Sequence, residues 1–273
     1  MDLSYILFNT IVYGVLATTL AAFMAYWKFF NLAVAAYFVL SSYVVYQLIT
    51  FWFGRGFVAI ALLLVWVFFC LHQLLLKLFK NEKQRDLAAI VITLSAAYFL
   101  DNVIAYFYGP WSINIQNIQI GIGTLIAIFV LLLLAFYYVF SRSTIWVVLK
   151  WIYEKTAVIK SLWVRVDRLL QIVFGMFLIL LLATSFLYLT KSAIRPTDGI
   201  FFLLKAVGIM IMVWVDKKEY MFMGSLLYVI VEYLLFIERW LPIVYKETLI
   251  LFVILAVLLI KPEGLFSLAK RKT

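Results

Sequence analysis

Four polar side chains within apolar stretches are the residues of this sequence best placed to do chemistry. They are Asn31, Asp101, Asn102 and Glu232. An ionisable group inside a membrane span is costly, so its presence indicates a binding site, a transport path or a buried partner. For Asp101 and Glu232 two interpretations are open: each lines a cavity, or each pairs with a basic group such as Arg55 or Lys205.

Catalytic and metal-binding chemistry is poorly provided for. The chain has one histidine, His72, and one cysteine, Cys70, which excludes the usual zinc site and any nucleophile–histidine device not built on His72. It has no Gly-x-x-x-x-Gly-Lys-Ser/Thr phosphate-binding loop and no dinucleotide-binding fingerprint. We therefore expect no enzyme activity and no cofactor in this chain. If ATP and Mg²⁺ are used, another chain must bind them.

The composition indicates which elements carry these residues. Of the 273 residues 67% are hydrophobic and only 13% are charged, and the mean hydropathy is +1.11. A soluble domain of this size could not cover so much apolar surface. We expect an all-α polytopic membrane protein in a lipid bilayer. The net charge of +10 comes from basic residues in short loops and does not indicate nucleic-acid binding.

Apolar runs of about 20 residues predict about nine membrane segments. They fall at 5–26, 31–51, 57–76, 87–107, 119–141, 169–190, 200–215, 220–238 and 246–260. The whole chain, 1–273, forms one domain with a first membrane half (1–141), a cytoplasmic loop (142–168), and a second half with a short basic tail (169–273). Gly109-Pro110 ends the fourth run, and Pro196 separates the sixth from the seventh.

Basic residues in the loops predict the orientation. Of the 23 Lys and Arg residues, six fall on one side (Arg55, Lys191, Arg195, Lys205, Arg239 and Lys246), which leaves 17 on the other. The richer side is cytoplasmic, so the N-terminus lies outside and the C-terminus inside. The short pair of segments within 200–238 is either two tilted helices or a re-entrant element.

The segment 142–168 is the longest interval without a membrane-spanning run. At helical period Lys150, Glu154, Arg165 and Arg168 form a polar stripe opposite an apolar one, and Asp167 adds a second acid. Two interpretations fit a basic amphipathic helix at this place. It lies on the lipid headgroups, or it is a coupling element that a cytoplasmic partner binds.

Several stretches, taken in order, resemble the membrane permeases of branched-chain amino acid ABC importers (the LivH/LivM type). They are 13–17 (Tyr-Gly-Val-Leu-Ala), 31–35 (Asn-Leu-Ala-Val-Ala), 41–44 (Ser-Ser-Tyr-Val), 202–207 (Phe-Leu-Leu-Lys-Ala-Val), 226–232 (ending in Glu232) and 258–266 (ending in Lys-Pro-Glu-Gly-Leu-Phe). The tail is the most specific match. The sequence departs from the family where Val34, Ala35 and Ala36 replace His-Gly-Glu.

The resemblance implies the transmembrane subunit of an ABC importer in a bacterial or archaeal cytoplasmic membrane. Such a permease imports small amino acids or related polar solutes. It works with a second permease or a copy of itself, two ATP-binding subunits and an extracytoplasmic solute-binding protein. Asn31, Asp101, Asn102 and Glu232 are then candidates for the substrate path. The coupling candidates are Lys150, Glu154, Arg165, Asp167 and Arg168.

Two other functions remain open for the same chain. One is a degenerate permease-like scaffold that assembles with partners and transports nothing. The other is a self-contained secondary transporter, for which Asp101 and Glu232 are the obvious acids of a coupling-ion site.

Overall fold

The computed structural model describes residues 3–27, 31–50, 85–115, 121, 123, 124, 127, 166–213, 220–237, 252 and 256. Its named elements are α1 (Leu3–Trp27), α2 (Val34–Thr50), α4 (Arg85–Tyr108), α8 (Val166–Leu189), the 3-10 helix η2 (Pro196–Asp198), α9 (Gly199–Val213) and α10 (Met221–Ile237). The described part of the chain is all-helical and contains no strand. The expected all-α class is confirmed there.

Six of the nine predicted segments coincide with these helices. The segment 57–76, most of 119–141 and of 246–260, and the loop as far as residue 165 lie outside the described residues. Four described helices are long and apolar enough to cross a membrane: Tyr5–Ala25, Ile90–Tyr108, Arg168–Leu189 and Pro196–Val213. The count of nine and the coupling helix stay predictions.

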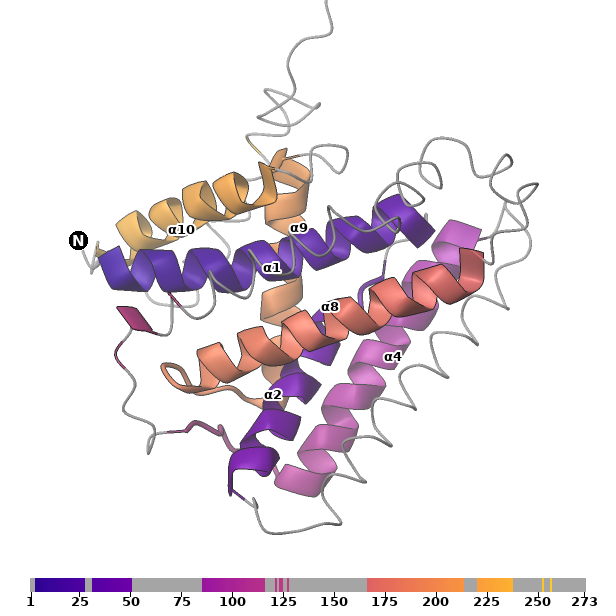
Figure 1. Ribbon diagram of the computed structural model, residues 1–273, viewed down its shortest axis with the longest axis horizontal. Coiled ribbons are helices and arrows are strands. Elements are labelled where there is room, and N and C mark those ends of the chain that lie inside the picture. Colours follow the sequence, from indigo (N-terminus) through magenta and orange to yellow (C-terminus); the bar gives the residue numbers. More distant parts are fainter. Residues whose placement is uncertain are drawn as a thin grey trace, which may run out of the picture.

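Helix α1 lies at the centre of the bundle. It contacts α8, α9 and α10, and 89% of its apolar window is buried. Figure 1 shows α10 running beside α1 while α9 crosses both steeply. A helix that is apolar on all sides buries its whole apolar surface only when other helices or lipid surround it. Helix α1 is apolar on all sides and is surrounded by other helices.

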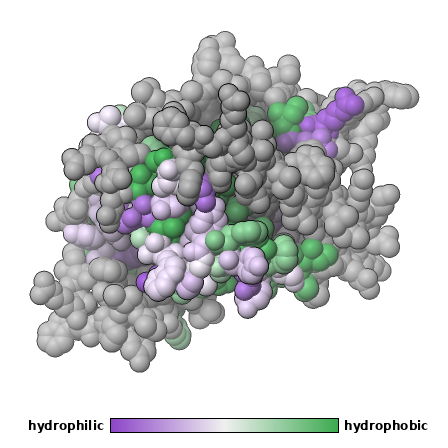
Figure 2. All heavy atoms as spheres, turned by 90° about the horizontal axis from the view of Figure 1, so that it is seen from below, coloured by the Kyte–Doolittle hydropathy of each residue, from purple (hydrophilic) through white to green (hydrophobic). Residues whose placement is uncertain are grey.

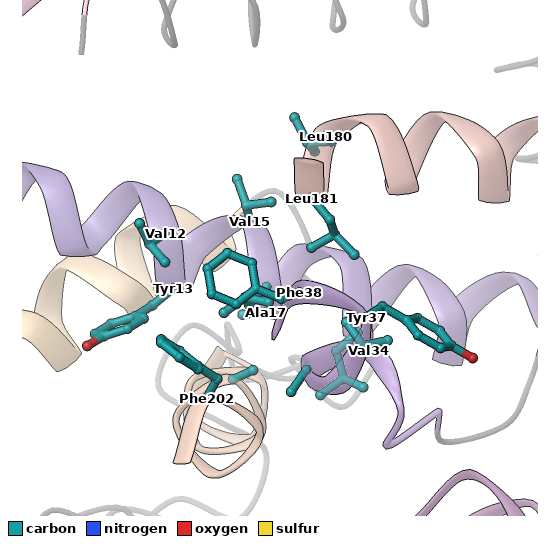
Figure 3. Close-up of a cluster of buried hydrophobic side chains, with 14 of the residues drawn as sticks. Val12, Tyr13, Val15, Ala17, Val34, Tyr37, Phe38, Leu180, Leu181 and Phe202 are labelled. Atoms are coloured by element: carbon teal, nitrogen blue, oxygen red, sulfur yellow. The ribbon is translucent and has the colours of Figure 1, made fainter. Parts of the chain in front are cut away.

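Aromatic rings join α2, α8 and α9 beneath α1. The ring of Phe38 lies 4.9 Å from that of Phe202 and 5.8 Å from that of Tyr188, in edge-to-face contacts. Figure 3 shows Phe38 and Phe202 converging with Tyr13 and Val15 of α1. Edge-to-face pairs add to the stabilisation from buried area. The Ser185 hydroxyl of α8 also donates to the Phe38 carbonyl, at 3.1 Å.

The helix ends follow the predicted breaks. Gly109 has φ of +73°, the left-handed conformation that glycine adopts readily after a helix, and Pro110 prevents α4 from continuing. Pro196 is the first residue of η2, a position where proline is favoured because its missing N–H would be unpaired there anyway. Beyond α4, Ile113 pairs with Ile194 in an isolated antiparallel bridge, which holds the connection after α4 against the α8–η2 turn.

Helix α4 lies at the edge of the described bundle. Only 17% of its apolar window is buried, and large side chains such as Tyr98, Phe99, Tyr106 and Phe107 are mostly exposed. The coloured part of the face in Figure 2 mixes green apolar residues with pale and purple ones. Large aromatic side chains exposed together along one helix need lipid or protein against them.

Candidate functional site

A cavity of about 860 Å³ lies between α2, α4 and the η2–α9 junction. It is lined by Leu32, Ala35, Ala36, Leu94, Ser95, Ala97, Tyr98, Phe99, Asp101, Asn102, Ala105, Thr197, Gly199, Ile200 and Leu203. Ligand pockets in proteins usually measure roughly 300–1,000 Å³, so this one could hold a small organic molecule. The lining is mostly apolar, with a few polar groups where α4 meets η2.

Short side chains keep the cavity open. Ala35 and Ala36 form its α2 wall, and Ala97 and Ala105 contribute to its α4 wall. Alanine side chains carry no hydrogen-bonding group. The wall of α2 therefore offers no polar group to a ligand at these positions, and the chemistry of the cavity comes from α4 and η2.

Asp101 presses its carboxylate against the start of α9. A methyl group placed on Gly199 would lie 3.2 and 3.3 Å from its two oxygens, so glycine at this position gives the carboxylate room. The oxygen Oδ1 is buried and accepts no hydrogen bond. Of the two sequence interpretations, the structure gives Asp101 the one in which it lines a cavity.

Asn102 lines the same cavity with a more exposed side chain. Its amide nitrogen donates to the Tyr98 carbonyl of its own helix at 2.7 Å. The amide is thereby oriented, and its side-chain oxygen is left as an acceptor. Asp101 and Asn102 are thus the two predicted site residues that the structure brings together.

Asn31 has a different place, in the turn that leads into α2. It is fully buried, and its side-chain oxygen accepts the Ala33 N–H at 3.1 Å. This local bond is the type by which asparagine stabilises a turn before a helix. Nearby, the Leu32 N–H donates to the Thr93 hydroxyl of α4 at 3.2 Å. Asn31 therefore fixes the entry to α2 and is not among the residues that line the cavity.

Glu232 of α10 pairs with Lys205 of α9. Lys205 Nζ lies 2.7 Å from Glu232 Oε1 and also donates to the Tyr13 hydroxyl of α1 at 3.1 Å. The two charged side chains are 14% and 9% exposed, so the pair is mostly sheltered from solvent. Of the two interpretations open for Glu232, the structure therefore shows the ion pair. Lys205, which was a possible partner for either Asp101 or Glu232, pairs with Glu232.

This pair corrects the count of basic residues used for orientation. Lys205 was assigned to the outer side with the loop residues, but it lies within α9 and neutralises a buried acid. A paired lysine inside a helix says nothing about which loop faces the cytoplasm. Without Lys205, the predicted outer side has five basic residues, against 17 on the predicted inner side.

The sequence named Lys205 as a possible partner of Asp101 or Glu232, but it did not indicate three other site residues. Tyr13 completes the Glu232 cluster, and Thr197 and Gly199 complete the cavity. Lys205 could be named because a lysine in an apolar run needs a buried acid. The place of Thr197 and Gly199 depends on how η2 sits against α4, which no local pattern indicates.

Of the coupling candidates, Lys150, Glu154 and Arg165 lie outside the described residues. Asp167 and Arg168 are placed in the first turn of α8, which begins at Val166, before the predicted segment start at 169. Helix α8 is 24 residues long in all and contacts α2, including the Ser185–Phe38 hydrogen bond. It therefore packs against the helix that carries Ala35 and Ala36 of the cavity wall.

Comparisons with known proteins do not add to this site. No family model, no curated protein and no solved structure matches the chain. Among the described residues no cluster of three His, Cys, Asp or Glu side chains could hold a metal ion. The site is therefore interpreted from its own geometry: a cavity with one carboxylate between apolar helices, and a buried ion pair that ties three helices together.

Proposed function

We propose that this chain is the transmembrane permease subunit of an ABC importer. It conducts a small amino acid or a related polar solute, and ATP hydrolysis on partner subunits drives the transport. The partners are a second permease, two cytoplasmic ATP-binding subunits and an extracytoplasmic solute-binding protein. The chain carries no ATP or Mg²⁺ itself and sits in a bacterial or archaeal cytoplasmic membrane with its N-terminus outside.

The cavity is the observation that carries this proposal. Its walls come from α2, α4 and α9, and two of these helices are long and apolar enough to cross a membrane when η2 is counted with α9. Along α4 it extends from Leu94 to Ala105, eleven residues or about 16 Å of helix. That is about half the thickness of a hydrocarbon core. A path for a polar solute needs an open space within the membrane and a polar side chain that lines it, as Asp101 does here.

Helix α8 supplies a route from the cytoplasmic segment to the cavity. It begins at the end of the 142–168 segment and reaches α2 at Phe38, two residues from the cavity wall at Ala36. Twenty-four helical residues span about 36 Å, so one rigid rod can connect the two places. Force generated by ATP-binding subunits would thereby change the width of the cavity.

The buried ion pair weighs against a secondary transporter. Such a protein needs an acid that exchanges its coupling ion, and Glu232 already has Lys205 as its counter-ion. Asp101 alone remains for that role among the described acids of the cavity. The degenerate scaffold differs from the proposed permease only in lacking transport, so an activity measurement separates these two.

Charge reversal in the coupling segment tests the proposal. Glu154→Lys makes a basic segment more basic, which should strengthen its binding to lipid headgroups. The same change should weaken its binding to an ATP-binding subunit, because the new lysine would face the basic group that paired with Glu154. Breaking a partly buried charged contact costs about 2–5 kcal/mol, so at least tenfold weaker retention of the ATP-binding subunits is expected. The measurement is co-purification of those subunits with the tagged chain from its native host.

The matched control is Glu82→Lys, which adds the same charge in the predicted inner loop at 77–86. It should leave co-purification unchanged. Liposome binding by a peptide covering 142–168 completes the experiment. Unchanged co-purification of the Glu154→Lys chain, combined with tighter liposome binding of the variant peptide, would mean that the segment is only a headgroup-binding helix.

A further inference from the structure

The cavity contains an acid but no base among the described residues that line it. Asp101 is its single ionisable side chain apart from the phenol of Tyr98, and its other polar lining groups are Ser95, Asn102 and Thr197. The one described lysine within these helices, Lys205, is engaged by Glu232 and Tyr13. Among the described lining residues, Asp101 is therefore the single side chain that can supply a full charge, and that charge is negative.

No Lys or Arg is among the described residues that line the cavity around Asp101. Its oxygen Oδ1 is buried and accepts no hydrogen bond, and Gly199 allows the carboxylate to lie close against α9. Asp198 directly precedes Gly199, so a second acidic residue adjoins this contact. Asp198 itself accepts the Arg195 N–H at 2.8 Å, so it is committed to capping η2. A buried carboxylate with an empty lone pair and a like charge beside it favours a cation in the adjoining space.

We propose that the cavity binds a compound with a primary ammonium group on an apolar body and without a carboxylate. The ammonium has three donors, and the cavity offers three acceptors near its polar end: Asp101 Oδ1, the Thr197 hydroxyl and the Asn102 side-chain oxygen. The apolar body lies along the alanines of α2 and Leu203 of α9. This inference rests on the proposed function and narrows it: within the class of amino acids and related solutes, it assigns the cavity to the amines and not to the amino acids themselves.

The missing base distinguishes an amine from an amino acid. The α-carboxylate of an amino acid lies within about two bonds of its ammonium group, so it would enter the same region as Asp101 and Asp198. A carboxylate placed there meets repulsion and no Lys or Arg among the lining residues. Amino acids should consequently bind more weakly than the amines that share their side chains.

Four compounds with one aromatic body isolate the charge. They are phenethylamine (positive), 2-phenylethanol (neutral), 3-phenylpropanoate (negative) and phenylalanine (both charges). Binding to the full-length chain in lipid nanodiscs is measured by calorimetry. Phenethylamine should bind at least tenfold more tightly than each of the others, because only it gains a charge-assisted bond without a repulsive one.

Two variants and one control place the binding at the cavity. Asp101→Asn should weaken phenethylamine binding at least tenfold and leave 2-phenylethanol unchanged. Ala36→Leu, which fills the cavity without changing its charge, should weaken binding of both. Asp86→Asn makes the same amide change in α4, fifteen residues or about 22 Å away, and should have no effect.

The proposal is overturned if phenylalanine or 3-phenylpropanoate binds as tightly as phenethylamine. It is equally overturned if Asp101→Asn binds phenethylamine as the native chain does. Binding is measured on this chain without an ATP-binding subunit. A failure here leaves the ABC importer assignment standing, and a failure of co-purification leaves the ligand result standing.

Discussion

The contact between Lys205 and Glu232 shows what a single pair of residues does in this fold. The lysine comes from α9 and the glutamate from α10, and the lysine also contacts the hydroxyl and the ring of Tyr13 from α1. Each charge would be expensive alone in an apolar bundle, whereas together they are neutral and hydrogen-bonded. The cluster therefore fixes how three helices meet, independently of any ligand.

Removing one partner should be worse than removing both. Glu232→Gln leaves the Lys205 ammonium uncompensated, and a broken buried pair typically costs about 3–5 kcal/mol. The double variant Lys205→Met with Glu232→Leu should restore most of the lost free energy of unfolding. The measurement is unfolding by SDS titration in mixed micelles, followed by tryptophan fluorescence.

Lys205→Met alone and Glu232→Leu alone complete the double-mutant cycle with this double variant. The coupling energy should be favourable and should exceed about 1 kcal/mol, the usual value for an exposed pair. Additive single effects would show that the two side chains do not stabilise each other. Tyr13→Phe should have a smaller effect, since it removes one hydrogen bond and keeps both charges.

At the scale of helices, glycine sets how closely α9 and α10 approach. A methyl group placed on Gly224 of α10 would collide with Val213 of α9 and would lie 3.4 Å from the side chain of Ile209. Val213 is β-branched, so it has few rotamers into which it could move. Without a side chain at Gly224 the two helices can pack directly, as small residues allow in membranes.

Gly224→Ala should destabilise the chain by about 1–3 kcal/mol, as expected for an overfilled contact. Gly175→Ala in α8 is the matched control, because no heavy atom lies within 4 Å of the added carbon. It should be neutral or stabilise by up to roughly 1 kcal/mol through helix propensity. Both are compared with the native chain by the same SDS titration. Equal effects at the two positions would contradict the close approach of α9 and α10.

Helix positions could be predicted from the sequence, and their packing could not. The breaks at Gly109-Pro110 and Pro196 act through backbone chemistry, so they appear in the structure where the sequence placed them. Hydropathy does not separate an enclosed helix from a peripheral one. The apolar spans of α1 and α4 are similarly hydrophobic, yet 89% of the span in α1 is buried and only 17% of the span in α4. Asp101 and Glu232 look alike in sequence for the same reason, because their partners come from other helices.

At the scale of the whole molecule, the described helices suit an apolar surrounding. Four described helices meet the length and composition of membrane spans, and α4 presents an aromatic surface that water would not favour. Helix α9 contains 15 residues, about 22 Å, and crosses α1 steeply (Figure 1), so the two cannot both stand along the membrane normal. Such a short crossing helix beside a cavity resembles the interrupted helices found at transport sites.

The central claim is that partner subunits drive a solute through this cavity by hydrolysing ATP. The direct measurement is the uptake of labelled amino acids and amines by proteoliposomes. These contain the complex that co-purifies with the tagged chain, and ATP is either present or absent on the side that the cytoplasmic face of the complex occupies. We predict uptake that requires ATP and that falls at least tenfold in Ala36→Leu, while the ATP-binding subunits remain associated. Uptake that proceeds without ATP would contradict the account in favour of a secondary transporter, and a complex that hydrolyses ATP but accumulates no solute would contradict it in favour of a scaffold.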